Sequence, residues 1–251
     1  MLKNKIIYCP IILLVIFVVY LYIANAFIYY RISRGYFTLP HRHSSYSMIN
    51  NQNLATTTYV AIGDSLTAGT GAKTYEESYP YLLATKMSAA GANIDFKNFS
   101  TPGFKTVDVI NVLLDPAIKA QPDVVTLLIG VNDIHNHVGR DQFKKNYEII
   151  LNRLTTETKA KIYLINIPYI GSNTAIVPPL DYYFSTETDT YNKIIKELAT
   201  EYNLTYIDLN TPTKNLFKTD KKRKIFTDRF TRANGDRFCK SSIYNGRWKS
   251  K

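Results

Sequence analysis

The stretch Gly63–Leu66, with the sequence GDSL, is the part of the chain best suited to chemistry. It follows the apolar run Tyr59–Ile62 and precedes the small, glycine-rich string Thr67–Gly71. A strand that stops at a glycine and opens into glycine-rich backbone exposes a hydroxyl at the end of a parallel sheet. A serine hydroxyl is a poor nucleophile until a base takes its proton. Ser65 therefore predicts acyl transfer, on the condition that a base lies near it.

Two downstream segments carry groups that suit the same reaction. Gly103 ends the small-residue stretch Ser100–Gly103, and Asn132 lies in Gly130–Asp133, which follows another apolar run. The oxyanion that forms when an ester is attacked requires several fixed hydrogen-bond donors. The backbone N–H groups of Ser65 and Gly103 and the neutral amide of Asn132 supply three such donors. A glycine at position 103 also lets the backbone approach a substrate without an intervening Cβ.

From Thr58 onward, apolar runs alternate with helical patterns. The predicted strands are Tyr59–Ile62, Ile94–Asn98, Val124–Ile129, Lys161–Ile167 and Thr205–Asp208. The predicted helices are Tyr79–Ala90, Thr106–Leu114, Gln142–Thr156 and Thr188–Tyr202. Such alternation predicts an α/β fold, with helices on both faces of a parallel sheet. Ligands of these sheets bind beyond the carboxyl ends of the strands, and Ser65 and Asn132 both follow such ends.

Three blocks of sequence, in order, resemble those of the SGNH hydrolases of the GDSL lipase/esterase group. The blocks are Gly63–Leu66, Asn98–Gly103 and Gly130–Asp133, and the resemblance covers about residues 58–210. It implies a three-layer, flavodoxin-like α/β sandwich with a five-stranded parallel sheet. It also implies hydrolysis of an acyl or O-acetyl ester of a lipid or glycan, with no metal or organic cofactor.

The resemblance assigns roles to individual residues. Ser65 is the implied nucleophile, and Ser65, Gly103 and Asn132 form the implied oxyanion hole. The fourth block of the family, D-x-x-H, is best matched by Asp228–Thr231. Asp228 is then the implied catalytic carboxylate, but Thr231 stands where the family has its general-base histidine. A threonine hydroxyl is no stronger a base than the serine hydroxyl it would serve.

The missing histidine has three competing explanations, because no histidine follows His137. The tail beyond about Phe230 is out of frame or truncated, as its abrupt gain in charge and loss of pattern suggest. Alternatively, the chain is a non-catalytic relative that binds esters or sugars at the cell envelope. In the third explanation, His135 or His137 replaces the missing base. We therefore expect severely reduced turnover. The predicted hydrolase-like domain covers residues 58–230, and an atypical basic tail, 231–251, follows it.

The first 30 residues predict a membrane segment. Ile6–Tyr30 is apolar almost throughout, and 25 residues of helix, at about 1.5 Å each, exceed the roughly 30 Å of bilayer hydrocarbon. A cleaved signal peptide is the alternative, since Ala24–Ala26 fits the small-residue cleavage pattern. Residues 31–57 are polar and are predicted to form a linker. A membrane anchor and a cleaved signal peptide both place the domain outside the cytoplasm, either on a single-pass anchor or secreted.

The formal charge of +11 is concentrated at one end of the chain. Lys214–Lys251 holds 13 basic and 3 acidic residues, a net +10, which leaves +1 for the rest. A nucleic-acid-binding face on the domain is therefore not expected. The two cysteines, Cys9 and Cys239, make neither a disulfide framework nor a thiolate metal site. The long connection Pro168–Ser185 is predicted as a loop on the substrate side.

Overall fold

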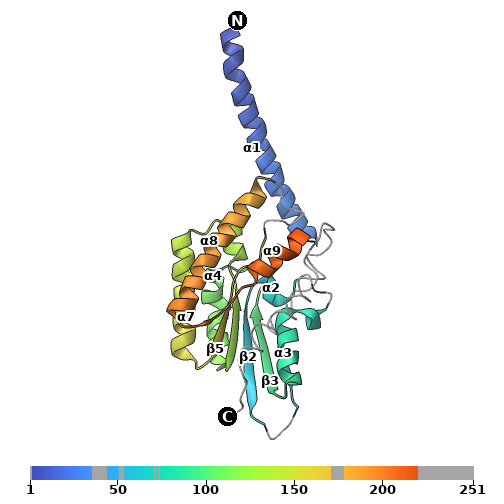
Figure 1. Cartoon of the computed structure of the whole chain (residues 1–251), viewed down its shortest axis with the longest axis vertical. Helices are drawn as coiled ribbons and strands as arrows, with labels where there is room; N and C mark the ends of the chain where they lie inside the picture. Colours follow the sequence, from blue (N-terminus) through green and yellow to red (C-terminus); the bar gives the residue numbers. More distant parts are fainter. Residues whose placement is uncertain are drawn as a thin grey trace.

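A computed structural model describes residues 2–35, 44–50, 54–70, 72, 74–170 and 178–219 (Figure 1). Within these residues, the domain is built on one six-stranded sheet with the strand order β1-β3-β2-β4-β5-β6. The strands are β1 (Ser44–Met48), β2 (Thr56–Gly63), β3 (Asn93–Ser100), β4 (Val124–Leu128), β5 (Lys161–Ile165) and β6 (Thr205–Ile207). All neighbouring strands run parallel except β1, which pairs antiparallel with β3.

Helices cover both faces of this sheet (Figure 1). The longer helices of the domain are α3 (Tyr79–Ala89), α7 (Arg140–Glu157), α8 (Leu180–Glu201) and α9 (Asn210–Thr219), and α1 (Leu2–Gly35) precedes them in the chain. The short ones are α2 (Ser65–Ala68), η1 (Tyr75–Glu77), α4 (Thr106–Asp108), the π-helical turn η2 (Val109–Leu113), α5 (Leu114–Lys119) and α6 (Val131–His135). The three-layer α/β fold is thus the one predicted.

The two hydrophobic cores follow from the alternation of side chains along the strands. Val60 and Ile62 of β2 point to one face, where they pack with buried residues of η2, α5, α7 and α8. Tyr59 and Ala61 point to the other face, where they pack with α3. All five residues of β4 are buried, as expected for a central parallel strand with helices on both sides.

The sheet has one strand more than the five predicted. The additional strand, β1, lies in residues 31–57, which were predicted as a linker, and it is antiparallel rather than parallel. Its sequence, SSYSM, lacks an apolar run, but Tyr46 and Met48 alternate and pack on the core beside α3. The Tyr46 ring stacks on Tyr75 with centroids 5.2 Å apart. The period-two spacing of these two side chains was the available signal.

Helix α8 begins earlier than predicted. It starts at Leu180 rather than at Thr188, so the last part of the loop predicted over 168–185 is helical. Phe184 is buried one turn before Thr188 and extends the same buried face toward the amino terminus. The two prolines before Leu180 indicated a loop, but a proline directly before a helix is compatible with its first turn. Residues 171–177 of the predicted loop lie outside the described residues.

Helix α1 projects away from the domain (Figure 1). Among the described residues it is the one helix long and apolar enough to cross a membrane, with a mean hydropathy of 2.4 over Pro10–Phe27. A signal sequence near the amino terminus meets the same criteria of length and composition. The helix also continues past the predicted apolar segment to Gly35.

Candidate active site

The strand register brings three of the predicted site segments to one edge of the sheet. Gly63, the last residue of β2, pairs with Ser100 of β3 on one side and with Leu128 of β4 on the other. Ser65 follows Gly63 by two residues, and Gly103 and Asn132 follow closely after the ends of β3 and β4. Because β3, β2 and β4 are adjacent and parallel, all three segments leave the sheet at its carboxyl-end edge.

Close packing around Gly63 determines how the chain enters the nucleophile turn. A Cβ at this position would lie 2.1 Å from Thr67 Oγ1 and 2.3 Å from the Leu128 carbonyl oxygen, so only glycine fits. The next residue, Asp64, caps helix α2, because its Oδ1 accepts a hydrogen bond from Leu66 N at 3.0 Å. Ser65 is the first residue of α2 and is half-buried. The predicted nucleophile is therefore fixed at the start of a capped helical turn.

Gly103 lies in a tight turn beyond β3. Its φ angle is +86°, in the left-handed region that glycine adopts without steric cost, and the residue is exposed. Thr101 N donates to the Gly63 carbonyl at 3.2 Å, and Phe104 N donates to the Thr101 carbonyl at 3.2 Å. These bonds tie the turn directly to the end of β2, next to the serine.

Asn132 is linked to the same turn. It is the second residue of α6, and its Nδ2 donates a hydrogen bond to the Phe104 carbonyl at 2.9 Å. A side-chain amide carries two N–H groups, so this bond orients the amide and leaves a second donor. The segments that carry Gly103 and Asn132 are thus in direct contact. This contact holds the two predicted donor segments next to each other.

Buried polar residues, of which only Asp133 belongs to a predicted block, hold this arrangement together. Asp133 is completely buried and accepts hydrogen bonds from Thr106 N at 3.0 Å and from Thr106 Oγ1 at 2.6 Å. Asn146 Nδ2 donates to the same Thr106 Oγ1 at 2.8 Å. Asp133 thus joins α6 to the start of α4, just beyond the Gly103 turn. Burial raises the pKa of Asp133, while the bonds from Thr106 oppose that rise.

The carboxyl group of Asp64, directly before Ser65, lies in an unusual environment for an acidic side chain. The residue is completely buried, and its Oδ2 has no hydrogen-bond partner among the described residues. Burial raises the pKa of Asp64 from 3.8 to about 7, and the nearby Asp133 carboxylate adds to the rise. Asp64 therefore holds a proton well above the usual pH range for an aspartic acid.

The two histidines after Asn132 face helix α8. The His135 ring lies edge-on to Phe184 with centroids 5.0 Å apart, and burial lowers its pKa to about 4. His137 Nδ1 lies 2.9 Å from the Tyr183 hydroxyl oxygen. Within the described ranges, no hydrogen bond joins either ring to Ser65. These contacts therefore do not support the prediction that His135 or His137 replaces the missing base.

The other residues predicted for the site lie outside the described part of the chain. Asp228, Thr231 and the basic tail 231–251 lie outside the described residues, so the predicted catalytic carboxylate has no described position. Among the residues that the structure does describe, there is no group of three or more His, Cys, Asp or Glu side chains able to hold a metal ion.

Comparison with solved structures finds the same fold in several hydrolases. Acetylxylan esterase Axe2 from Geobacillus stearothermophilus is 19% identical with a TM-score of 0.60, over 73% of this chain and 93% of that one. The acetyl xylan esterase AlAXEase is 23% identical with a TM-score of 0.60, over 74% and 100% of the two chains. LAE5, an α/β hydrolase from the metagenome of Lake Arreo, Spain, is 16% identical with a TM-score of 0.61, over 74% and 94%.

Residues 61–232 match the GDSL-like lipase/acylhydrolase family. This match spans well over half of the chain and includes the three blocks at the sheet edge, as well as Asp228. A search of curated proteins found no match. The chain therefore belongs to the GDSL-like lipase/acylhydrolase family and is, by that membership, a carboxylic ester hydrolase.

Proposed function

We propose that the carboxyl-end edge of the sheet cleaves acyl or O-acetyl esters by a serine mechanism. Ser65 Oγ attacks the ester carbonyl, the ester C–O bond breaks, and the alcohol leaves with the proton from the Ser65 hydroxyl, which gives an acyl-enzyme. Water then cleaves the acyl-enzyme, releases the acid and restores the Ser65 hydroxyl. The Ser65 N–H, the Gly103 N–H and the Asn132 amide bind the oxyanion. The observation that carries this proposal is the register of β3, β2 and β4, together with the Asn132 bond to the Gly103 turn.

The turnover of this chain is impaired in our proposal. Asp228 takes the role of the carboxylate in the fourth block, but Thr231 offers no proton acceptor for Ser65. Loss of one member of a catalytic triad leaves only the rate enhancement that comes from the oxyanion hole and substrate binding, about 10³–10⁴ over water. Slow hydrolysis that depends on Ser65 is the expected activity.

The location we propose is the membrane, with α1 as a single-pass anchor and the catalytic domain outside the cytoplasm. The mean hydropathy of 2.4 over Pro10–Phe27 supports an anchor. Cleavage near Ala24–Ala26 would instead give a secreted enzyme.

The alternative function is a non-catalytic envelope module that binds esters or sugars. The missing histidine favours it, because an intact donor site without a base still binds a carbonyl oxygen. Hydrolysis of p-nitrophenyl acetate by the wild type and by Ser65→Ala separates the two functions. We expect wild-type hydrolysis above background that Ser65→Ala abolishes. Equal background rates in the two proteins, with ester binding retained, would favour the module.

A further inference from the structure

The first turns of α8 extend beyond the carboxyl-end edge of the sheet. Ile167 N, just past β5, donates to Asn192 Oδ1 at 2.8 Å, which places Asn192 at the level of the strand end. Leu180 precedes Asn192 by twelve residues, or about 18 Å of helix. Because α8 runs back toward the start of β6, its amino-terminal part stands above the edge that carries Ser65 and Asn132.

This projecting part of α8 is joined to the candidate active site. Tyr183 and Phe184 contact His137 and His135, which lie in and just beyond α6. Asn132, the proposed oxyanion donor, lies one turn earlier in the same short helix. The beginning of α8 therefore forms part of the wall beside the site rather than a separate surface.

Helix α1 packs against this same end of the domain. The Tyr20 hydroxyl donates a hydrogen bond to the Pro178 carbonyl at 2.6 Å, directly before α8. Ala24, one helical turn after Tyr20, is only 6% exposed. In Figure 1, α1 leaves the domain where α8 begins, at the end of the sheet that carries α2. The apolar helix and the candidate active site thus share one end of the molecule.

The length of α1 indicates where a bilayer surface would lie. The apolar window of α1, Pro10–Phe27, makes about 27 Å of helix, close to the roughly 30 Å of bilayer hydrocarbon. Tyr20 and Tyr22 lie in the second half of this window, and Tyr22 is 77% exposed. Tyr182, at the start of α8, is 76% exposed. Tyrosine concentrates at the boundary between hydrocarbon and water. The second half of the window, where α1 meets the start of α8, is therefore the part nearest the bilayer surface that faces the domain.

We propose that the carboxyl-end edge of the sheet faces the bilayer that holds α1, and that the site takes esters of membrane lipids. This substrate class rests on the proposed esterase function. The ester groups of a lipid lie at the boundary between head groups and hydrocarbon, close to the place where α1 meets the start of α8. A lipid ester can thus reach Ser65 from the membrane, whereas a soluble polymer would have to enter between the domain and the bilayer.

The orientation is tested by fluorescence quenching in vesicles of brominated phosphatidylcholine, with the full-length chain. The background variant is Trp248→Phe, which removes the single tryptophan. In it, Tyr182→Trp reports on the carboxyl-end edge, and Leu54→Trp is the matched control. Leu54 is 49% exposed and lies just before β2, at the opposite edge of the sheet. We expect strong quenching at position 182 and little at position 54. Equal quenching, or stronger quenching at position 54, would overturn the orientation.

The substrate class is tested by the ratio of two hydrolysis rates: that of a diacylglycerol in phosphatidylglycerol-containing vesicles and that of p-nitrophenyl acetate. Tyr182→Glu should lower the ratio about fivefold, because the anionic surface repels the new charge. Leu54→Glu should leave the ratio unchanged. Cleavage of p-nitrophenyl acetate alone would overturn the lipid substrate. Failure to cleave either ester would count against the esterase function, while the quenching result would still decide the orientation.

Discussion

The carboxyl ends of β2, β3 and β4 differ from those of β5 and β6 in what they contribute to the site. At the first three strand ends, the donors proposed for catalysis lie within a few residues of the sheet. Buried hydrogen bonds hold them there: Asp133 binds Thr106, and Asn132 binds the Phe104 carbonyl. The oxyanion-binding half of the site is therefore built from short, local connections.

The ends of β5 and β6 are equally well bonded but supply structure rather than chemistry. Asn166 Oδ1 accepts hydrogen bonds from Leu209 N at 2.6 Å and from Asn210 N at 3.0 Å, which fixes the start of α9. The family's acid–base block is expected only after this helix, around Asp228. The donors are therefore fixed by the sheet, whereas the base depends on a later segment, which can change without disturbing the donors.

Restoring the base is the change with the largest expected effect. Thr231→His should raise kcat for p-nitrophenyl acetate by at least about 100-fold, since a positioned general base contributes 10²–10⁴. Thr231→Gln, which adds a polar side chain of similar size without a base, is the control and should give no gain. Steady-state kinetics measure both. A gain that persists in the Ser65→Ala, Thr231→His double variant would show that the histidine does not act through Ser65.

Removing an oxyanion donor should produce the next largest effect. In the Thr231→His background, Asn132→Ala should lower kcat by about 10²–10³, as expected for the loss of one such donor. Asn136→Ala is the control for the fold of α6, because Asn136 caps the same helix and its Nδ2 donates to the Asn132 carbonyl at 2.7 Å. Similar losses in the two variants would mean that Asn132 acts only through the fold of α6.

Asp64 should make the stability of the domain depend on pH. Its pKa is about 7 in the folded protein and 3.8 ordinarily, so the folded state holds the proton more tightly. The free energy of unfolding should therefore fall by about 3–4 kcal/mol as the pH rises from 4 to 8. Urea unfolding at each pH, followed by circular dichroism, measures this free energy. Asp64→Asn should flatten this pH dependence. The control variant Asp141→Asn, at an exposed position, should leave the pH dependence as it is in the wild type. An identical pH dependence in wild type and Asp64→Asn would refute this role.

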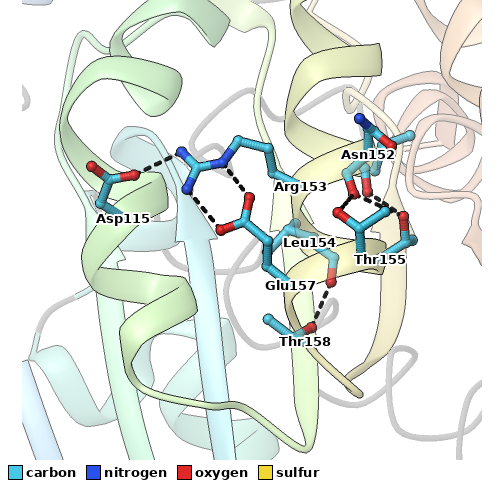
Figure 2. A network of polar contacts seen from close by, with 9 residues as sticks. Asp115, Asn152, Arg153, Leu154, Thr155, Glu157 and Thr158 are labelled. Atoms are coloured by element: carbon cyan, nitrogen blue, oxygen red, sulfur yellow. Dashed lines mark hydrogen bonds and ion pairs between the residues drawn. The ribbon is translucent and has the colours of Figure 1, made fainter.

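A surface cluster far from the donor residues should matter least. Arg153 bonds both oxygens of Glu157 and reaches Asp115 at 2.7 Å (Figure 2). Exposed ion pairs contribute little, because solvent screens them and ordering the side chains costs entropy. Arg153→Ala should lower Tm by less than about 4 °C and leave ester hydrolysis unchanged. Calorimetry and p-nitrophenyl acetate kinetics check this, and a loss of activity would contradict the separation of the two regions.

Much of the fold could be predicted because its signals are local. Buried parallel strands such as Val124–Leu128 are continuous apolar runs, and the glycines beyond them mark where the chain turns. The strand at Ser44–Met48 was missed because only Tyr46 and Met48 show its alternation. The Thr106–Asp133–Asn146 network was out of reach for a different reason. Its members are far apart in sequence, and only the packing of α4, α6 and α7 brings them together.

The most direct test of the central claim is the site at which a fluorophosphonate reacts. Mass spectrometry of the labelled, full-length protein should find the adduct on Ser65, slowly in the wild type and faster in Thr231→His. The label should disappear in Ser65→Ala. If folded protein, verified by circular dichroism, carries no adduct on Ser65 in either the wild type or Thr231→His, then this sheet edge does not hold an activated serine.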